Sequence, residues 1–237
     1  MVIIALLTDF GTRDYFVGAM KGAILFINEN VHIVDITHEI APHDVKSAAF
    51  NLRACYKDFL VGTIFVAVVD PGVGSARRAI LVETEDYFFI APDNGLLSFA
   101  FDEAENFRVC ELSNEKFFYH PVSRTFHGRD VFAPCAAHLS RGAKAADFGG
   151  KIEDFIVLPE KIPQRIGNEG VLEAELLFID RFGNLITNLR AADLPPKFAL
   201  TVGDRKITKK LNYFAEAAAG ARNALRVPQP PCRRSRS

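Results

Sequence analysis

The first 140 residues alternate between apolar runs of strand length and amphipathic stretches of helix length. Runs that predict strands lie at 2–7, 32–36 and 63–69, and an unbroken apolar run such as 63–69 is typical of a strand buried on both faces. Apolar residues recur at helical spacing over 14–28 and 45–56, which predicts two helices. This alternation indicates an α/β domain with a mostly parallel sheet and flanking helices.

Further signals extend this domain to about residue 160. Strands are predicted at 79–83 and 87–91, and a helix over 131–139. Asp44 and Asp130 each precede a helical stretch, where a carboxylate accepts hydrogen bonds from free backbone N–H groups, so both are predicted to cap helices. We assign residues 1–160 to this domain.

The hydrophobic pattern changes beyond residue 160. A proline-containing segment at 159–163 is predicted to be a linker. Three strand-like runs follow without long helices between them, at 171–179, 185–189 and 198–207. Gly203 and Asp204 together predict the turn of a hairpin. These features indicate a smaller all-β domain over 161–210.

Residues 211–237 depart from the strand pattern. An alanine-rich stretch is followed by a tail of Pro, Arg and Ser without apolar periodicity, a composition typical of disorder. We therefore expect an atypical, disordered tail after Lys210 and an incomplete β domain, truncated or altered at its carboxyl end. Unpaired strand edges would weaken the folding of such a domain.

Composition and charge exclude several classes of protein. The chain has 237 residues, of which 49% are hydrophobic, enough for a sizeable core. A formal net charge of -1 provides no electrostatic footprint for nucleic acid. The longest apolar runs are far shorter than the ~20 residues that span a bilayer, and the amino terminus lacks the order of a signal peptide. We expect a cytoplasmic protein without a membrane partner.

The sequence also predicts no metal site. The four cysteines are scattered, with no CxxC pair and no group of histidines and cysteines at the spacing of metal ligands. His38 and Glu39 are adjacent, but one such pair provides too few ligands.

Polar side chains follow three of the predicted strands. Asp9 comes after the first strand, Asp70 after the run at 63–69, and Asp93 and Asn94 after the run at 87–91. The carboxyl ends of parallel strands meet at one edge of a sheet, where ligands bind, so we expect these groups at that edge. Asp and Asn are also common turn residues, and this alternative explains each of them taken alone.

Two glycine-containing segments carry the candidate chemistry. They read Asp-Pro-Gly-Val-Gly-Ser-Ala-Arg at 70–77 and Thr-Phe-His-Gly-Arg-Asp at 125–130. They place the carboxylate of Asp70, the fixed cation of Arg77 and the imidazole of His127 on turns where glycine allows close approach. The structural alternative is that Asp70 caps a turn, Arg77 is a solvated cation and His127 starts a helix.

Seven segments, in order, resemble the S-adenosylmethionine hydroxide adenosyltransferases, also called SAM hydrolases, which are relatives of fluorinating and chlorinating enzymes. The segments are Leu-Leu-Thr-Asp-Phe-Gly at 6–11, Gly-Ala-Met-Lys-Gly at 18–22, Asp-Ile-Thr-His-Glu at 35–39, Val-Asp-Pro-Gly-Val-Gly at 69–74, Ala-Pro-Asp-Asn-Gly at 91–95, Thr-Phe-His-Gly-Arg-Asp at 125–130 and Asp-Arg-Phe-Gly-Asn at 180–184. One segment alone would be a weak signal, whereas seven in the same order are specific.

The resemblance implies hydrolysis of S-adenosyl-L-methionine to adenosine and L-methionine, with water or hydroxide attacking the ribose C5′ and with no cofactor. The family's catalytic Asp-Arg-His set falls on Asp70, Arg77 and His127, with Arg78 as the alternative arginine. The resemblance also implies residues that contact the substrate. In the first domain these are Asp9, which would bind the ribose hydroxyls, and Phe10, Asp93, Asn94 and Gly128. The family is typically a homotrimer, and Asp180, Phe182 and Asn184 would contact the methionine end across a subunit boundary.

Two alternative functions stay open at this point. One is a protein that binds S-adenosylmethionine or adenosine without turnover, an alternative suggested by the altered carboxyl terminus. The other is a halogenase, in which a halide replaces hydroxide at the same carbon. Halogenating relatives lack the His-Gly-Arg-Asp form present at 127–130, and the fluorinating branch carries an extra loop that this length does not accommodate, so hydrolysis is favoured.

Overall fold

The structure is a computed structural model, and it describes residues 2–159, 163–166, 171–189, 194–195 and 198–207. The chain divides into two compact units, residues 1–158 and 159–237. The tail predicted at 211–237 lies outside the described residues. No helix in the described ranges combines the length and the apolar character needed to cross a membrane.

The first unit alternates strands and helices as the hydrophobic pattern predicts. Its main elements are β1 (Val2–Thr8), α1 (Phe16–Ile27), β2 (Val31–Thr37), α2 (Val45–Cys55), β3 (Ile64–Val68), β4 (Ala79–Thr84), β5 (Phe88–Pro92), α3 (Ser98–Glu103), β6 (Phe107–Glu111), the π-helical turn η3 (Gly128–Phe132) and α4 (Ala133–Ser140). Short 3-10 turns lie at Tyr56–Asp58, Glu115–Phe117 and Ala145–Asp147.

One six-stranded sheet, in the order β2-β1-β3-β5-β4-β6, forms the centre of this unit. β1 pairs in parallel with β2 and β3, and β3 pairs in parallel with β5. β4 is antiparallel to both of its neighbours. The prediction of a mostly parallel sheet with flanking helices is confirmed. α3 and β6 were not predicted, because α3 has only six residues and β6 includes Arg108 and Glu111 and so lacks an unbroken apolar run.

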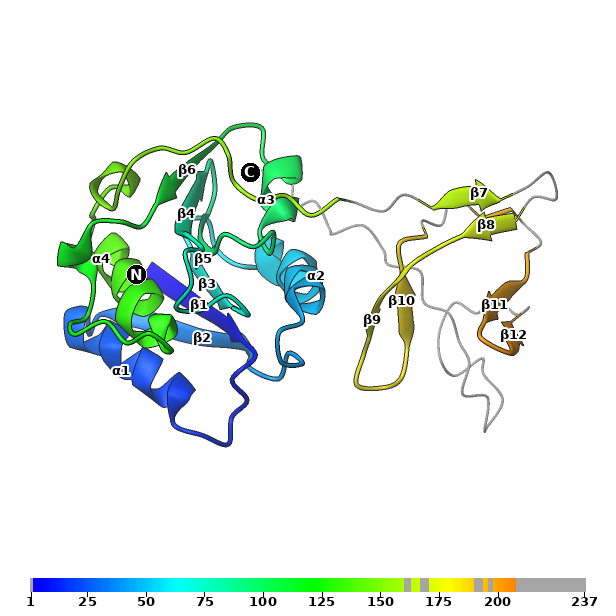
Figure 1. Ribbon diagram of the computed structural model, residues 1–237, viewed down its shortest axis with the longest axis horizontal. Helices are drawn as coiled ribbons and strands as arrows, with labels where there is room; N and C mark the ends of the chain where they lie inside the picture. The colour runs from blue at the N-terminus through cyan, green and yellow to red at the C-terminus, as the bar shows by residue number, and fades with distance from the viewer. Residues whose placement is uncertain (1, 160–162, 167–170, 190–193, 196–197, 208–237) are drawn as a thin grey trace. The chain divides into compact units, whose positions relative to one another are not determined.

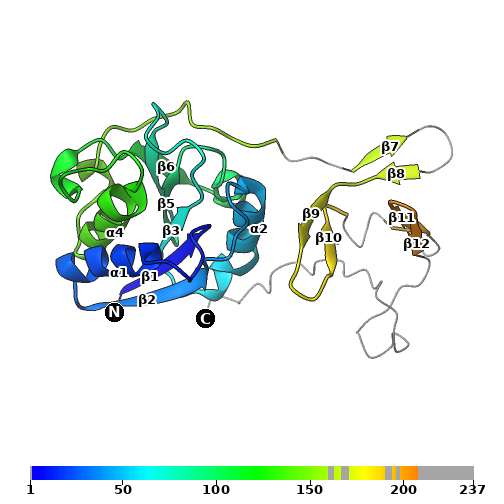
Figure 2. The ribbon, with the colours of Figure 1, turned by 60° about the horizontal axis from the view of Figure 1, so that its bottom comes forward.

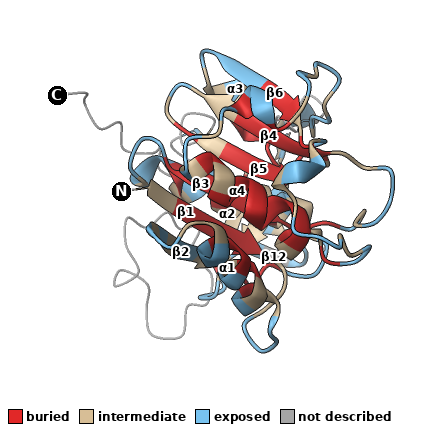
Figure 3. Cartoon of the chain, turned by 90° about the vertical axis from the view of Figure 1, so that its left-hand side faces the viewer, coloured by how far each residue is buried: buried red, intermediate tan, exposed pale blue. Residues whose placement is uncertain are grey.

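Side-chain alternation along the strands divides the core between the two faces of the sheet. In β3, Ile64, Val66 and Val68 pack with α1 and α4, whereas Phe65 and Ala67 pack with α2 and α3. The ribbon shows α1 and α4 on one face and α2 and α3 on the other (Figures 1 and 2). Burial is concentrated in the central strands and in α4 (Figure 3). Helices therefore cover both faces of the sheet.

The second unit is built from short antiparallel pairs. They are β7 (Gln164–Ile166) with β8 (Val171–Glu173), β9 (Leu176–Ile179) with β10 (Leu185–Thr187), and β11 (Leu200–Val202) with β12 (Arg205–Ile207). The hairpin turn predicted at Gly203 and Asp204 is confirmed. The strand-like run at 171–179 forms two strands, β8 and β9, which pair with β7 and β10 respectively. Between them, the Glu175 N–H donates to Asn188 Oδ1 over 2.8 Å.

The predicted cap of α2 is confirmed and can be tested by substitution. Asp44 Oδ1 accepts the Ser47 backbone N–H over 3.0 Å, and Asp44 Oδ2 accepts the Ser47 hydroxyl. We expect Asp44→Ala to lower the free energy of unfolding by about 1 kcal/mol, because an amide at the start of the helix loses its partner. Asp44→Asn is the control, since asparagine caps helices about as well. Urea unfolding followed by circular dichroism checks this, and equal losses in both variants would contradict the capping role.

Candidate active site

Asp70, Arg77 and His127 form a connected array beyond the carboxyl end of β3. Arg77 Nε donates to Asp70 Oδ1 over 3.0 Å. Arg77 Nη2 donates to Asp70 Oδ2 and also to His127 Nδ1, the latter over 2.8 Å. The side chains of Asp70 and Arg77 are 5% and 12% exposed, so their ion pair is largely withdrawn from solvent. The structure thus brings the three predicted catalytic residues together.

The guanidinium determines the hydrogen-bonding state of His127. Arginine can only donate, so Nδ1 of His127 is an acceptor and the neutral ring carries its proton on Nε2. Burial lowers the pKa of His127 from 6.5, and the positive charge of Arg77 lowers it further. The carboxylates of Asp70 and Asp130 and a backbone hydrogen bond at Ser123 oppose this shift without cancelling it. The imidazole is therefore neutral at neutral pH.

The adjacent Arg78 has different partners. Its Nη2 donates to Asp93 Oδ2 over 2.8 Å, and its Nη1 donates to Asp154 Oδ1 over 2.6 Å. Asp93, whose side chain is 2% exposed, also accepts the Ile156 N–H over 2.8 Å. Of the two arginines, the geometry therefore places Arg77 in the array. Asp93 was predicted to contact substrate, but its carboxylate is taken up by protein groups and does not join the array.

A glycine accounts for the close packing of the two segments that carry the array. Gly74 has a φ of +77°, and a Cβ at this position would lie 2.3 Å from the carbonyl oxygen of Arg124. Only glycine fits such an approach in the left-handed region. The 70–77 turn therefore rests directly on the segment that precedes His127, which brings Arg77 within reach of the imidazole.

His127 immediately precedes the π-helical turn η3. The Ala133 N–H bonds the carbonyl of Gly128, five residues earlier, and such turns frequently occur at functional sites. A Cβ at Gly128 would meet Met20 Sδ at 3.1 Å and Phe10 Cε2 at 3.2 Å. Phe10 and Gly128, both predicted substrate contacts, therefore pack against each other close to the array.

Asp130 does not cap a helix, which corrects the prediction. The helical segment already begins at Gly128, so Asp130 lies inside it, where its carboxylate is fully buried. Asp130 Oδ2 accepts the Ser123 N–H over 2.8 Å, and Oδ1 accepts from Arg129 Nε over 2.6 Å. Asp130 thus ties the loop before His127 to the helix after it.

Asp9 follows the last residue of β1, and Asp70 lies two residues after the end of β3. These two strand ends are adjacent, because the parallel register pairs Thr8 with Val68. The expectation that these carboxylates share one edge of the sheet is confirmed. Asp9 Oδ2 accepts the His43 N–H over 2.9 Å. His43 has a φ of 66°, a conformation in which a side chain other than that of glycine is strained. No local pattern in the sequence signals this role of His43.

Asn94 supports the array from the neighbouring strand. Its Nδ2 donates to the Val69 carbonyl oxygen over 2.8 Å, and its Oδ1 accepts the Leu96 N–H over 3.2 Å. The amide therefore holds the peptide group that immediately precedes Asp70.

The three residues predicted for the methionine end lie in the β9–β10 turn of the second unit. Asp180 Oδ1 accepts the N–H groups of Phe182 and Asn184 over 2.9 and 2.8 Å, and Asp180 Oδ2 accepts from Asn184 Nδ2. Gly183 adopts a φ of 83°, which closes the turn. The Phe182 side chain is 87% exposed. The turn is thus internally braced and presents one aromatic ring to the surroundings.

Across the described segments, no group of three or more His, Cys, Asp or Glu side chains is arranged to hold a metal ion. The cysteines that the structure describes, Cys55, Cys110 and Cys135, are free.

Comparison with known families supports the resemblance noted from the motifs. Residues 4–149 match the SAM hydroxide adenosyltransferase N-terminal domain. Residues 174–226 match the C-terminal domain of the same family, a match that runs past the start of the tail predicted at 211–237.

Individual relatives agree with these matches. The chain is 35% identical over 218 residues to an (R)-S-adenosyl-L-methionine hydrolase of Salinispora tropica, covering 92% of this chain and 83% of the relative. It is 31% identical to a fluorinase of Actinoplanes sp., covering 81% and 73%. A crystal structure of a conserved Thermotoga maritima protein superposes with a TM-score of 0.82 and 34% identity, covering 91% of this chain and 85% of that one. The chain therefore belongs to the SAM hydroxide adenosyltransferase family.

Proposed function

We propose that this protein hydrolyses S-adenosyl-L-methionine to adenosine and L-methionine, with water or hydroxide attacking the ribose C5′. The observation that carries the proposal is the linked array of Asp70, Arg77 and His127, found in a chain of this family. The sulfonium of the substrate is a stereocentre, and the name of the Salinispora relative specifies the (R) form. We therefore propose the (R) form as the substrate.

The chemistry of the leaving group explains why this set of residues suffices. Attack at C5′ breaks the C–S bond, and the electron pair leaves on sulfur as a neutral thioether, methionine. No proton has to be delivered to the leaving group, so the reaction needs no general acid. The enzyme has to align an oxygen nucleophile with the C–S bond, and the proton that water loses passes to solvent. Such alignment alone supplies several kcal/mol of barrier lowering.

Arg77 and Asp70 are assigned complementary roles. The guanidinium is a fixed positive charge in a site largely withdrawn from water, where it favours hydroxide over water. Asp70 binds two guanidinium nitrogens and so fixes the plane and direction of Arg77. The two residues act as one unit.

We assign His127 to orientation of the nucleophile and not to proton abstraction. Its Nδ1 lone pair is already occupied by Arg77, and its lowered pKa makes it a weak base. A neutral ring with its proton on Nε2 acts as a hydrogen-bond donor beside the cation.

Substrate binding is assigned to residues of both units. Asp9 is proposed to hold the ribose hydroxyls, with Phe10 and Gly128 beside it. Asp180, Phe182 and Asn184 are proposed to contact the methionine end across a subunit boundary of a homotrimer, and the exposure of Phe182 supports an intermolecular role for its ring. We also propose a cytoplasmic enzyme that needs no cofactor, because the thioether leaves as a neutral group and cleavage of the C–S bond needs only an aligned oxygen nucleophile.

The primary test is product analysis by chromatography with each sulfonium epimer. We expect adenosine and methionine in equal amounts from the (R) form. Asp70→Asn and Arg77→Gln should each lower kcat by about 100-fold or more with little change in KM, because each breaks the array that stabilises the nucleophile. The matched control is Arg53→Gln, which removes an exposed guanidinium bound to Glu103 and should keep kcat within about twofold.

The same assay separates the alternatives. Binding of S-adenosylmethionine by calorimetry without release of adenosine would contradict hydrolysis and support a binding protein. Halogenated adenosine in samples that contain chloride or fluoride would support a halogenase. Full activity in Arg77→Gln would remove Arg77 from the proposed role.

The titration of His127 tests its assigned protonation state. By NMR, we expect the imidazole to titrate below 6.5. Arg77→Gln should raise the pKa of His127, since it removes the nearest cation and frees Asp70. Arg78→Gln is the control and should leave this pKa unchanged, because Arg78 faces Asp93 and Asp154.

The lowered pKa of His127 also sets the sign of its effect on stability. The unfolded chain binds this proton more readily than the folded one, so the stability contribution is intact above about pH 6.5 and is lost as the pH falls through the folded-state pKa. A pKa of His127 at or above 6.5 in the wild type would contradict the neutral-donor role.

Phe182 tests the proposed intermolecular contact. Size-exclusion chromatography with light scattering should show a mass about three times that of the chain, which is 26.2 kDa. Phe182→Ala should raise KM about tenfold with little loss of kcat, because an anchoring ring contributes to binding and not to bond cleavage. Val171→Ala, an exposed apolar position in the same unit, is the control. An unchanged KM in Phe182→Ala would exclude this contact.

A further inference from the structure

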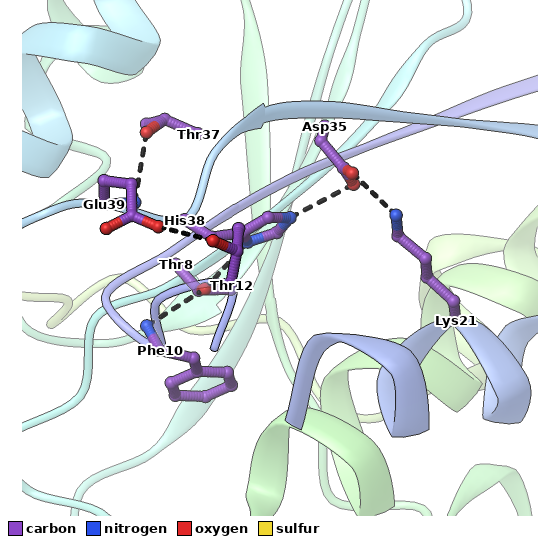
Figure 4. Close-up of polar contacts among 8 residues, drawn as sticks. All are labelled: Thr8, Phe10, Thr12, Lys21, Asp35, Thr37, His38 and Glu39. Atoms are coloured by element: carbon purple, nitrogen blue, oxygen red, sulfur yellow. Dashed lines mark hydrogen bonds and ion pairs between the residues drawn. The ribbon is translucent and has the colours of Figure 1, made fainter. Parts of the chain in front are cut away.

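A second polar network lies beside the carboxyl ends of β1 and β2, and the proposed reaction does not use it (Figure 4). It runs from Lys21 in α1 through Asp35 in β2 and His38 to Thr8 at the end of β1. Lys21 Nζ donates to Asp35 Oδ2 over 2.6 Å, Asp35 Oδ1 lies 3.1 Å from His38 Nε2, and His38 Nδ1 lies 2.9 Å from Thr8 Oγ1. Three of these four residues lie in motif segments that contribute nothing to the Asp70–Arg77–His127 array. Lys21 lies in the segment at 18–22, and Asp35 and His38 lie in the segment at 35–39.

The surroundings of His38 determine which ring nitrogen carries its proton. The side chain is 2% exposed. Nε2 is within ion-pair distance of the Asp35 carboxylate but outside hydrogen-bond geometry, and it has no hydrogen-bond partner in the described part of the chain. A carboxylate this close favours the proton on Nε2, which leaves Nδ1 as an acceptor. The Thr8 hydroxyl then donates to Nδ1, and this is the one hydrogen bond that the ring makes among the described residues.

The Thr8 hydroxyl connects this imidazole to the turn that carries Asp9. Thr8 Oγ1 accepts the Phe10 N–H over 3.2 Å. Since Thr8 is fully buried, its hydroxyl has no solvent partner to take over if His38 is removed. The bond to His38 keeps the hydroxyl proton turned away from the Phe10 amide, so that the oxygen lone pair faces that amide.

Backbone and surface contacts connect the same two loops. The Gly11 N–H donates to the His38 carbonyl oxygen over 2.7 Å. Thr12 Oγ1 donates to Glu39 Oε1 over 3.0 Å, and Glu39 in turn donates its N–H to Thr37 Oγ1 over 3.1 Å. The segment that follows β1 is therefore held along its length by the segment that follows β2, with His38 as the buried member.

We propose that His38 is a positioning residue that fixes the Asp9–Phe10 turn through the hydroxyl of Thr8, so that the Asp9 carboxylate meets the ribose hydroxyls in the binding orientation. The inference rests on the proposed function, because it uses Asp9 as the ribose contact. The ribose hydroxyls are on C2′ and C3′, whereas the proposed attack is at C5′, so we expect a loosened turn to weaken binding and to leave bond cleavage intact.

The experiment compares KM and kcat for S-adenosylmethionine in four variants. Thr8→Val removes the hydroxyl at nearly constant volume, and His38→Leu removes the imidazole. His38→Asn places an amide near the position of Nδ1 and is the rescue variant. Thr63→Val is the control, since Thr63 is another buried threonine, whose hydroxyl donates to the Leu60 carbonyl oxygen at the opposite end of β3.

We expect KM to rise about tenfold in Thr8→Val and in His38→Leu, with kcat within about twofold of the wild type. His38→Asn should restore KM to within about threefold, and Thr63→Val should change only the thermal midpoint. In the double variant Thr8→Val with His38→Leu, the two increases in KM should not multiply, because both substitutions break one link.

Other outcomes overturn the proposal. An unchanged KM with a lowered thermal midpoint would make the network purely structural, and a fall in kcat at constant KM would place His38 in the chemical step. Multiplying effects in the double variant would show that the two residues act independently. Should His38→Leu fail to fold, Thr8→Val and His38→Asn carry the test.

A second assay distinguishes a failure of the proposed hydrolysis from a failure of the positioning role of His38. Wild-type protein that releases no adenosine would refute hydrolysis, and the same variants are then compared by calorimetry with adenosine, which carries the ribose hydroxyls. A roughly tenfold weaker Kd in Thr8→Val and His38→Leu, rescued in His38→Asn, would support the positioning role. Equal values in all variants, or no binding by the wild type, would overturn it.

Discussion

The ion pair between Arg77 and Asp70 is the contact on which the carboxyl edge of the sheet depends. Both charges are largely withdrawn from solvent, and a buried charge that loses its partner costs several kcal/mol. The position of Asp70 is set by β3, which ends two residues before it. The chain therefore has to turn back over 70–77 for the Arg77 guanidinium to reach the Asp70 carboxylate. Closure brings Gly74 onto the Arg124 carbonyl and leaves Nη2 facing His127. One electrostatic requirement thus sets both the path of the loop and the geometry of the Asp70–Arg77–His127 array.

The parallel pairing of β1, β3 and β5 explains why so many polar groups meet at this edge. Strands that run in one direction end together, and here the register pairs Thr8 with Val68. Neighbouring loops then hold these groups by hydrogen bonds. The His43 N–H donates to the Asp9 carboxylate, and Asn94 Nδ2 donates to the carbonyl oxygen of Val69, which precedes Asp70. The sheet sets the approximate position of each group, and the hydrogen bonds between loops set its orientation. We therefore expect substitutions in these loops to alter the orientation of the polar groups while leaving the sheet intact.

Much of the first unit could be predicted because its signals are local. Unbroken apolar runs mark β1 and β3, a capping Asp44 marks the start of α2, and the motif segments single out Asp70, Arg77 and His127. The remaining features depend on tertiary contacts. Asp130 looks like a cap in sequence, but the π-helical turn starts earlier and buries it. Asp93 resembles a ligand contact, yet Arg78 and the Ile156 amide occupy it. The strained backbone of His43 has no sequence signature.

The two histidines near this edge show how partners decide the role of one residue type. At His127, Nδ1 faces a guanidinium, which can only donate, so the ring is held neutral and next to a cation, where we propose that hydroxide binds. At His38, Nδ1 faces a hydroxyl and Nε2 faces a carboxylate, so the ring is held by groups on both sides and has no route to solvent. A ring in the first setting can act on a reacting oxygen, whereas a ring in the second can act only through the groups it holds. The proposed division, in which His127 orients the nucleophile and His38 fixes the Asp9–Phe10 turn, follows from these contacts.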